Sequence, residues 1–512
     1  MTNQTLQNVF DAQDKGSVAL SSVAEPVVYG FVWLNGISLL SAILSFVQVI
    51  IIAQVLDPQL VGLVAVFYVI QGVLDSFTAT GFAKAIIQQK ETGQNYVDTA
   101  FVTHLLRGFL LASIVFFFAP LIVQILNTPK ARYIVQVMAI TMVLQGARNP
   151  GALFFMRRLT FYKQFVWYAS GALAKFTATV TLLYILRNEW AIVYGVLFYE
   201  IIMLMLSFLL IDIRPGLQWD INVFRSLFNY GKWVLFAAMV AAIERQGNQI
   251  ATVKILGEAS LGVLFFGVRI ASVPALVTQQ LKNVLFPVFS RLQDSYEEMK
   301  RLYQHSIGII AFFIFPVAGC GIVFAEPFTR LFLKTTWSQV TEILGLLVCA
   351  QAIQAIYTIT ISLFNAKGIP KIAFFNHLIQ SIIIIIAIYP IIKSSGIRGV
   401  AILYFINAIV SFLFCSGTLI RYFHFTIRIF AILLVPLIIS TLTSTVFYLG
   451  KQFVLINSIP IFFGNVIIFF IFYFLLSFGY ELITRKSDLK RTSVSSFSTM
   501  KSVKEVLLKK GI

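Results

Sequence analysis

Long apolar segments recur along almost the whole chain, and they restrict its fold more than any other feature of the sequence. Each is about twenty residues or longer, which is the length that a helix needs to cross the hydrocarbon core of a bilayer. Backbone N–H and C=O groups find no water there, so only a helix or a closed barrel can cross. The segments lack the alternation of apolar and polar residues that barrel strands show. The sequence therefore predicts an all-α integral membrane protein.

The composition agrees with this class and excludes a large soluble domain. Of the 512 residues, 59% are hydrophobic and only 12% are charged, whereas a soluble globular domain has about 25% charged residues. In a soluble protein, the net charge of +18 would suggest a nucleic-acid partner. In a membrane protein, Lys and Arg gather in the cytoplasmic connections, which accounts for most of this charge. We expect membrane lipids, and no nucleic acid, as partners.

The apolar segments predict about fourteen membrane-spanning helices. Lys and Arg are concentrated in alternate connections, which indicates that both termini lie in the cytoplasm and that the protein crosses a bacterial cytoplasmic (inner) membrane many times. The predicted spans are 30–55, 60–83, 99–126, 131–150, 165–186, 190–211, 231–256, 259–285, 303–325, 340–364, 370–392, 397–420, 429–449 and 453–483.

The connections between these spans are too short to form separate domains. The longest internal one, residues 212–233, contains Trp219 and Phe224 among polar residues, which indicates an amphipathic segment at the membrane surface. The expected parts are a cytoplasmic N-terminal segment (1–29), an N-terminal six-helix bundle (30–211), a cytoplasmic interfacial linker (212–230), a C-terminal six-helix bundle (231–420), helices 13 and 14 (421–483) and a basic cytoplasmic tail (484–512).

The two predicted bundles show a faint internal repeat. The stretch "VLDPQLVGL" (55–63) follows the first span, and "ILGEASLGV" (255–263) follows the seventh, so that Gly62 matches Gly262. With six spans in each half, both halves enter the membrane from the same side. This is typical of parallel repeats around an axis along the membrane normal. We therefore expect two pseudo-symmetric bundles around a central cavity, plus two C-terminal helices.

The stretch "FAAMVAAIERQGNQIATVKILG" (236–257) places charges in the middle of a predicted span. A charge that faces lipid there costs at least about 2.5 kcal/mol, so these side chains must face protein or a watery cavity. One hypothesis is an internal Glu–Arg network that locks helices together. The other is a cavity wall, which better explains five polar residues on one arc. Helical spacing gathers Glu244, Arg245, Asn248, Gln249 and Thr252 on that arc.

Further cations lie within other predicted spans. Arg107, Lys175 and Arg269 occupy the third, fifth and eighth spans. With Arg245 they outnumber the acids that lie away from the ends of the spans, and a cavity with surplus cations concentrates anions. The forked donors of a guanidinium also suit phosphate oxygens. The predicted substrate-binding residues of the cavity are Arg107, Lys175, Arg245, Arg269, Asn248 and Gln249.

Three acids lie away from the ends of the predicted spans: Asp75, Glu200 and Glu244. They are candidates for coupling transport to a proton or sodium gradient, because ionisable groups inside a membrane are usually functional. For Glu200, the alternative is a structural bridge to Lys175 on the neighbouring helix. Glu244 either neutralises Arg245 or weakens the attraction of Arg245 for an anionic ligand.

Several kinds of active site are missing from the sequence. No G-x-x-x-x-G-K-[ST] phosphate loop occurs, and no D-x-D pair of carboxylates occurs. The four His residues have no metal-ligand spacing, so no metal is predicted. No predicted outer loop is long enough for a catalytic head. We therefore expect a protein that is not an enzyme, has no catalytic residues and needs no cofactor.

Three stretches of the sequence follow a recognisable pattern. They are "GFAKAIIQQKE" (81–91), "GEASLGVLFFGVRIASVPALV" (257–277) and "QLKNVLFPVFSRLQD" (280–294). Within them, the residues that carry the pattern are Gly262, Arg269, Pro274, Pro287, Ser290 and Arg291. These stretches resemble bacterial polysaccharide transporters, the flippases of lipid-linked oligosaccharides that include O-antigen and exopolysaccharide exporters. The layout of the spans is similar over most of the chain.

The resemblance implies two six-helix bundles with additional C-terminal helices, on the scaffold of multidrug-and-toxin (MATE) exporters. It implies a substrate in which undecaprenyl pyrophosphate carries a short oligosaccharide, flipped across the membrane for surface polysaccharide biosynthesis. Glycosyltransferases and a polysaccharide polymerase are the implied partners. The anionic pyrophosphate fits the cationic cavity that the residues themselves predict, and alternating access is the expected mechanism.

Other functions stay open at this point. A flippase for the peptidoglycan precursor would also move an anionic lipid pyrophosphate. A drug or cation exporter on the same scaffold would need an acid-dominated cavity, whereas cations prevail here. A membrane polysaccharide polymerase would usually need a sizeable outer loop, which this chain lacks.

Overall fold

The computed structural model describes residues 20–78, 94–153, 161–211, 213–292, 295–425, 430–450 and 456–487. Most of the predicted N-terminal segment, the stretch 81–91 and the tail beyond residue 487 lie outside these described residues. Within the described ranges, every regular element is a helix. The predicted all-α class is therefore confirmed.

The first half of the chain forms long helices and one interrupted one. The predicted fourth span is divided, because the helix breaks at Ala139 and again after Gly146. The elements are α2 (Leu20–Val55), α3 (Pro58–Phe77), α5 (Gln94–Ile125), η1 (Pro129–Ala131), α6 (Arg132–Met138), α7 (Ile140–Gly146), η2 (Pro150–Leu153), α9 (Phe161–Leu186) and α10 (Trp190–Leu209).

The second half begins with a helix that starts inside the predicted interfacial linker. The Asp220 side chain caps this helix by accepting hydrogen bonds from the backbone N–H groups of Asn222 and Val223. The elements are α11 (Ile221–Ala271), α12 (Val273–Arg291), α13 (Tyr296–Val323), α14 (Ala325–Phe332), η3 (Thr335–Trp337), α15 (Ser338–Ala366), α16 (Lys371–Phe423), α17 (Ala431–Gly450) and α18 (Ile459–Ser487).

Eleven helices of the described ranges are long and apolar enough to cross a membrane. Two of them, α11 with 51 residues and α16 with 53, are far longer than one crossing needs. Each bends where a glycine takes a left-handed backbone, at Gly257 (φ 85°) and Gly396 (φ 55°). Glycine adopts this conformation without the steric cost of a Cβ atom. Each can thus supply two crossings, and the total of about fourteen stays a prediction.

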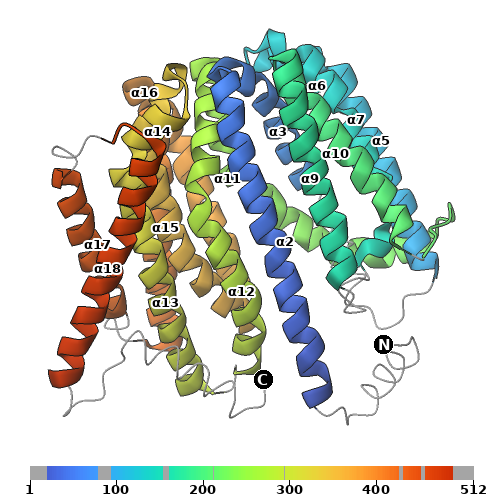
Figure 1. Ribbon diagram of the computed structural model, residues 1–512. Coiled ribbons are helices and arrows are strands. Elements are labelled where there is room, and N and C mark those ends of the chain that lie inside the picture. Colours follow the sequence, from blue (N-terminus) through green and yellow to red (C-terminus); the bar gives the residue numbers. More distant parts are fainter. Residues whose placement is uncertain are drawn as a thin grey trace.

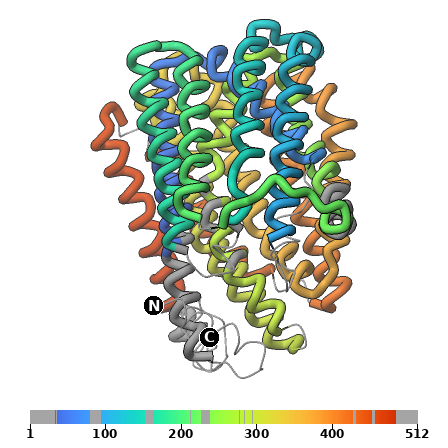
Figure 2. Tube along the Cα trace, turned by 90° about the vertical axis from the view of Figure 1, so that its right-hand side faces the viewer, coloured from blue at the N-terminus to red at the C-terminus, as the bar shows by residue number. Residues whose placement is uncertain are grey.

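The helices run roughly side by side in the bundle (Figure 1). The start of α2 and the end of α18 lie at the same end, which is lower in Figure 1 and is called the lower end here. The end of α2 and the start of α3 lie at the opposite, upper end (Figure 1), and the bend of α11 at Gly257 lies close to them, because the backbone of Glu258 meets Gly62 of α3. Both views place α18 along the outside of the bundle (Figures 1 and 2). The packing of α3 against α11 joins the two halves.

A reciprocal glycine contact brings α3 and α11 together at the upper end. A Cβ atom on Gly62 would lie 1.8 Å from the backbone oxygen of Glu258, and one on Gly262 would lie 2.0 Å from that of Pro58. Only glycine fits at either position, because a Cβ atom would overlap the opposite backbone. The matched glycines of the sequence repeat therefore lie against each other. Whether the whole halves are related by symmetry stays a prediction.

A second contact closes the upper end, between the loop before α15 and the turn after α2. Lys334 Nζ donates a hydrogen bond to the backbone oxygen of Val55 (2.7 Å), and Trp337 Nε1 donates one to that of Leu56 (3.0 Å). Trp337 is fully buried, and its ring packs against Phe266 with centroids 4.5 Å apart. These carbonyls end α2 and would otherwise lack partners. We call Lys334, Trp337 and the turn 55–57 the upper clasp.

Candidate functional site

The adjacent charges on α11 point to different halves of the protein. Glu244 Oε2 lies 3.5 Å from Nδ1 of His377 on α16, which belongs to the same half as α11. The Arg245 guanidinium instead donates a 3.4 Å hydrogen bond to Ser76 Oγ on α3, in the other half. No ion pair joins Glu244 to Arg245, both of which the structure describes. The hypothesis of a Glu244–Arg245 lock is thus not supported by the geometry.

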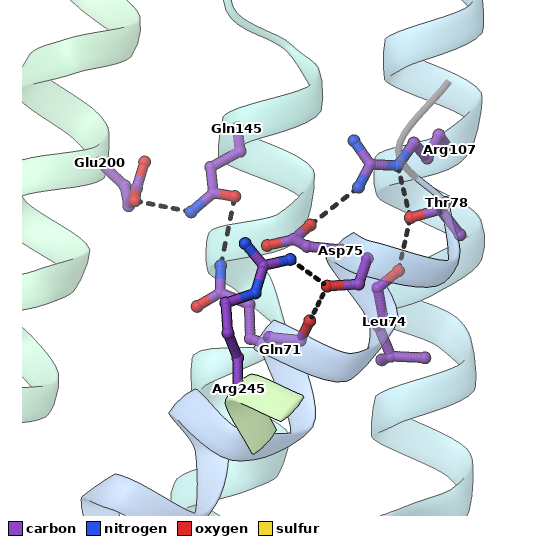
Figure 3. A network of polar contacts seen from close by, with 10 residues as sticks. Gln71, Leu74, Asp75, Thr78, Arg107, Gln145, Glu200 and Arg245 are labelled. Carbon is purple, nitrogen blue, oxygen red and sulfur yellow. Dashed lines mark hydrogen bonds and ion pairs between the residues drawn. The ribbon is translucent and has the colours of Figure 1, made fainter. Parts of the chain in front are cut away.

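Arg107 is held by an acid from the neighbouring helix. Its guanidinium pairs with Asp75 Oδ1 on α3 at 2.8 Å and donates a second 2.8 Å hydrogen bond to Thr78 Oγ1 (Figure 3). Thr78 in turn donates to the backbone oxygen of Leu74. A paired guanidinium has less charge to offer an anion than an unpaired one. Of the predicted substrate-binding cations, Arg107 is therefore the one already neutralised.

Glu200 pairs with a residue that the sequence did not single out. Its carboxylate accepts a hydrogen bond from Gln145 (2.8 Å), which contacts Gln71 on α3 (Figure 3), and it forms an ion pair with Arg148. The alternative of a bridge from Glu200 to Lys175 is not supported, because no ion pair joins these two described residues. Arg148 falls near the end of the predicted fourth span (131–150), and a linear apolar pattern does not show that the helix ends at Gly146. The break turns Arg148 back toward α10.

Lys175 and Arg269 come from opposite halves and line one small pocket. Lys175 lies on α9, and Arg269 lies on the part of α11 beyond Gly257. Within the described residues, neither side chain forms an ion pair. Arg269 lies over the Phe265 ring (5.0 Å to the centroid), and that ring stacks on Tyr68 with centroids 5.6 Å apart. We call this the inter-half pocket.

The inter-half pocket is lined by both polar and apolar residues. Ser45 and Gln48 of α2 contribute polar groups, and valine, isoleucine and alanine side chains of α2, α3 and α10 line the rest. Its volume is about 50 Å³, room for one or two water molecules. The pocket therefore has the chemistry of an anion site but is closed to a large ligand in this conformation.

The remaining polar residues of the α11 arc do not share one environment. Asn248 is only 1% exposed, and its side-chain oxygen lacks a hydrogen-bond partner among the described residues. Thr252 is fully buried and donates to the backbone oxygen of Asn248. Gln249 is half-buried, while Arg245 is exposed. The arc thus divides into a buried part and a part that a ligand can reach.

The surplus of cations persists after these pairs are formed. Asp75 neutralises Arg107, and Glu200 neutralises Arg148. Lys175, Arg245 and Arg269 form no ion pair among the described residues. Guanidinium and ammonium groups in such surroundings attract anions, and the guanidinium fork matches phosphate oxygens. The arrangement can therefore bind an anionic group between the two halves.

Comparison with known proteins assigns the family. A family model described as "Polysaccharide biosynthesis protein" matches residues 51–342, which is more than half of the chain. The chain belongs to the polysaccharide biosynthesis protein family. This membership confirms the resemblance that the three sequence stretches indicated, and all three stretches, 81–91, 257–277 and 280–294, lie inside the matched region.

Relatives of this polysaccharide biosynthesis protein span most of its length. The lipopolysaccharide biosynthesis protein WzxC of Escherichia coli (strain K12) is 23% identical over 398 residues, which cover 76% of this chain and 81% of WzxC. The succinoglycan biosynthesis transport protein ExoT of Rhizobium meliloti (strain 1021) is 22% identical over 368 residues, which cover 72% of this chain and 74% of ExoT.

Solved structures share the fold of this polysaccharide biosynthesis protein. The lipid II flippase MurJ, in an inward closed conformation, aligns with a TM-score of 0.72 and 17% identity, covering 88% of this chain and 99% of MurJ. A multidrug resistance MATE family transporter, in an inward-facing conformation, aligns with a TM-score of 0.63 and 14% identity, covering 78% of this chain and 95% of the transporter. The predicted relation to the MATE scaffold is confirmed, and the chain is a multi-pass membrane protein.

Proposed function

We propose that this protein flips an oligosaccharide linked to undecaprenyl pyrophosphate from the inner to the outer leaflet of a bacterial cytoplasmic membrane. The observation that carries the proposal is the inter-half pocket, where Lys175 and Arg269 converge without an acid partner among the described residues. Once the pocket has opened, a pyrophosphate bound there would contact both halves at once. The names of the relatives, in lipopolysaccharide and succinoglycan biosynthesis, support a surface polysaccharide as the product.

Arg245 supplies a second cationic group for the substrate, nearer the middle of α11. It is exposed and hydrogen-bonded only weakly, at 3.4 Å, to Ser76. The pyrophosphate would meet Arg245 first and then move toward Lys175 and Arg269. The sugars need a wet passage, and the lipid tail can remain in the bilayer. Arg107 is assigned a supporting role, because Asp75 already neutralises it.

Alternating access would open and close this pocket. The upper clasp and the Gly62–Gly262 contact hold the upper ends of the halves together in this conformation. With both termini in the cytoplasm, the upper end faces outward, so the conformation is closed to the outside. Parting the halves at the upper end would separate Lys175 from Arg269 and release the anion outward. In this proposal, the lower end faces the cytoplasm.

An ion gradient of protons or sodium would bias this cycle, and the three acids differ as candidates for the coupling site. Asp75 and Glu200 are each paired with a guanidinium, that of Arg107 and that of Arg148. Glu244 is not paired with a guanidinium among the described residues, and its carboxylate lies 3.5 Å from the imidazole of His377. We therefore propose Glu244 as the first candidate for the site that couples transport to the ion gradient. No catalysis and no cofactor are part of the proposal, and a polymerase or glycosyltransferase partner would act before or after transport.

A transport assay with three substrates tests the proposal against the alternatives. The purified protein is placed in vesicles that hold fluorescent undecaprenyl-pyrophosphate oligosaccharide, peptidoglycan precursor lipid or a cationic drug. We expect movement of the oligosaccharide lipid across the bilayer, scored by its accessibility to an external lectin. Movement of only the precursor lipid would assign the protein to peptidoglycan synthesis. Movement of only the drug would contradict the anionic-substrate account altogether.

A further inference from the structure

A second pocket lies at the lower end of the second half, away from the inter-half pocket. It forms where α13 begins and where α15 and α16 end, and its volume is about 440 Å³. Its floor is apolar, with Met299, Ile369 and Phe423, and its rim holds Tyr296 and Tyr422. The α15–α16 turn that bounds it contains Gly368 in a left-handed backbone (φ 74°). We call it the lower pocket.

Basic side chains surround the lower pocket. Lys367 and His424 line it directly. Lys300 Nζ lies 5.7 Å from the centroid of the Tyr296 ring, and Lys371 Nζ lies 5.8 Å from that of Tyr422. Among the described residues, Lys300 and Lys371 form no ion pair. Two lysines thus lie over the two aromatic rings of the rim, and two further basic side chains line the pocket itself.

Nearby acids do not occupy this pocket. Glu297 and Glu298 lie in the first turn of α13, where their negative charges interact favourably with the helix dipole, and both are exposed. Neither belongs to the residues that line the pocket. Tyr296 is fixed by donating a 2.6 Å hydrogen bond to the backbone oxygen of Phe423. The rim is therefore a positioned set of groups rather than a scatter of surface lysines.

From this geometry, we infer that the lower pocket binds the headgroup of an anionic phospholipid. Tyrosine and lysine at such a depth belong to the membrane interface, where the phosphate of a lipid lies. Basic pockets between membrane helices on the cytoplasmic side bind anionic headgroups. The apolar floor receives the glycerol and upper acyl chain, and the lysines receive the phosphate. This is a site distinct from the substrate path between the two halves.

The test is lipid retention by the full chain, measured by native mass spectrometry in detergent with added phosphatidylglycerol or phosphatidylcholine. We expect wild-type protein to retain phosphatidylglycerol preferentially. The double variant Lys367→Gln with Lys371→Gln should retain it roughly tenfold less well, because two cations near the phosphate are lost. The matched control removes two exposed lysines that lie away from this pocket, Lys130→Gln with Lys393→Gln, and should retain the lipid as wild type does.

Two results would overturn the inference. Equal retention of phosphatidylglycerol by wild type and by the Lys367/Lys371 variant would show that the pocket does not select the anionic headgroup. Competition by millimolar inorganic phosphate alone, with no preference between the lipids, would assign the pocket to a free phosphate instead. Unfolding temperatures of all variants, measured in the same detergent, separate lost binding from lost structure.

Discussion

Arg245 of α11 donates a 3.4 Å hydrogen bond to Ser76 of α3. A charged side chain of the second half therefore contacts the first half. Its sequence neighbour Glu244 faces the opposite way, toward His377. The two adjacent charges therefore serve different contacts. A substitution of Arg245 should accordingly act on what lies between the halves and leave Glu244 with its own partner.

The first prediction concerns Arg245. Arg245→Ala should lower transport of the oligosaccharide lipid at least about tenfold, because a charge-assisted hydrogen bond contributes about 1.5–3 kcal/mol and 1.4 kcal/mol is a factor of ten. Arg245→Lys keeps the charge but loses the fork, so it should restore only part of the activity. Membrane abundance should stay normal in both. Full transport by the double variant Glu244→Gln with Arg245→Gln would contradict a substrate contact.

The second prediction concerns the ion pair that the sequence pattern did not reveal. Arg148→Ala leaves the carboxylate of Glu200 buried without its cation, and Glu200 is only 3% exposed. Breaking a buried pair from one side costs about 3–5 kcal/mol. We expect a much lower unfolding temperature and scarce protein in the membrane. The double variant Arg148→Gln with Glu200→Gln should recover most of the stability; no recovery would mean that Arg148 acts through other contacts.

The third prediction concerns the glycine contact. Gly62→Ala should destabilise the protein by about 1–3 kcal/mol, because the new methyl group overlaps the Glu258 backbone and forces the helices apart. Gly464→Ala on α18 is the matched control, since a Cβ atom there has nothing within 4 Å. Alanine also favours a helix over glycine, so the control should be neutral or slightly stabilising. Equal unfolding temperatures for the two variants would show that α3 and α11 do not pack this closely.

The fourth prediction concerns the upper clasp. Lys334→Ala removes the hydrogen bond to the Val55 carbonyl and should favour opening of the upper end. A cysteine introduced at Leu56, which is 1% exposed, should then react faster with a membrane-impermeant maleimide added from outside. The control carries the same cysteine with Lys393→Ala, an exposed lysine outside the clasp. Equal labelling rates in both proteins would mean that the clasp does not hold the upper end closed.

The all-α membrane fold and the two cations of the inter-half pocket could be predicted from the sequence for clear physical reasons. A long apolar run has few alternatives to a membrane helix, and a charge inside such a run must have a partner or a ligand. Lys175 and Arg269 were selected on that ground, and the structure brings them to one pocket.

Partner choice was harder to predict, because it depends on where helices break and turn. Arg148 lies just beyond the end of α7 at Gly146, where its side chain forms an ion pair with Glu200 of α10. A linear apolar pattern does not show where that helix ends. Glu244 and Arg245 likewise contact different helices, α16 and α3, because of the way these helices pack around α11. A helical wheel of α11 alone carries no information about its neighbours. The glycine repeat did point to a true contact, since Gly62 and Gly262 meet.

The most direct test of the account is the affinity of the purified protein for undecaprenyl pyrophosphate, measured by isothermal titration in detergent. The variant Lys175→Gln with Arg269→Gln should bind about a hundredfold more weakly, because two charge-assisted contacts of about 1.5–3 kcal/mol each are lost. The control Asp75→Asn with Arg107→Gln removes a pair that is already neutral, and it should bind within a few-fold of wild type. Wild-type affinity in the Lys175/Arg269 variant, or an equal loss in the control, would contradict the claim that these two unpaired cations hold the pyrophosphate.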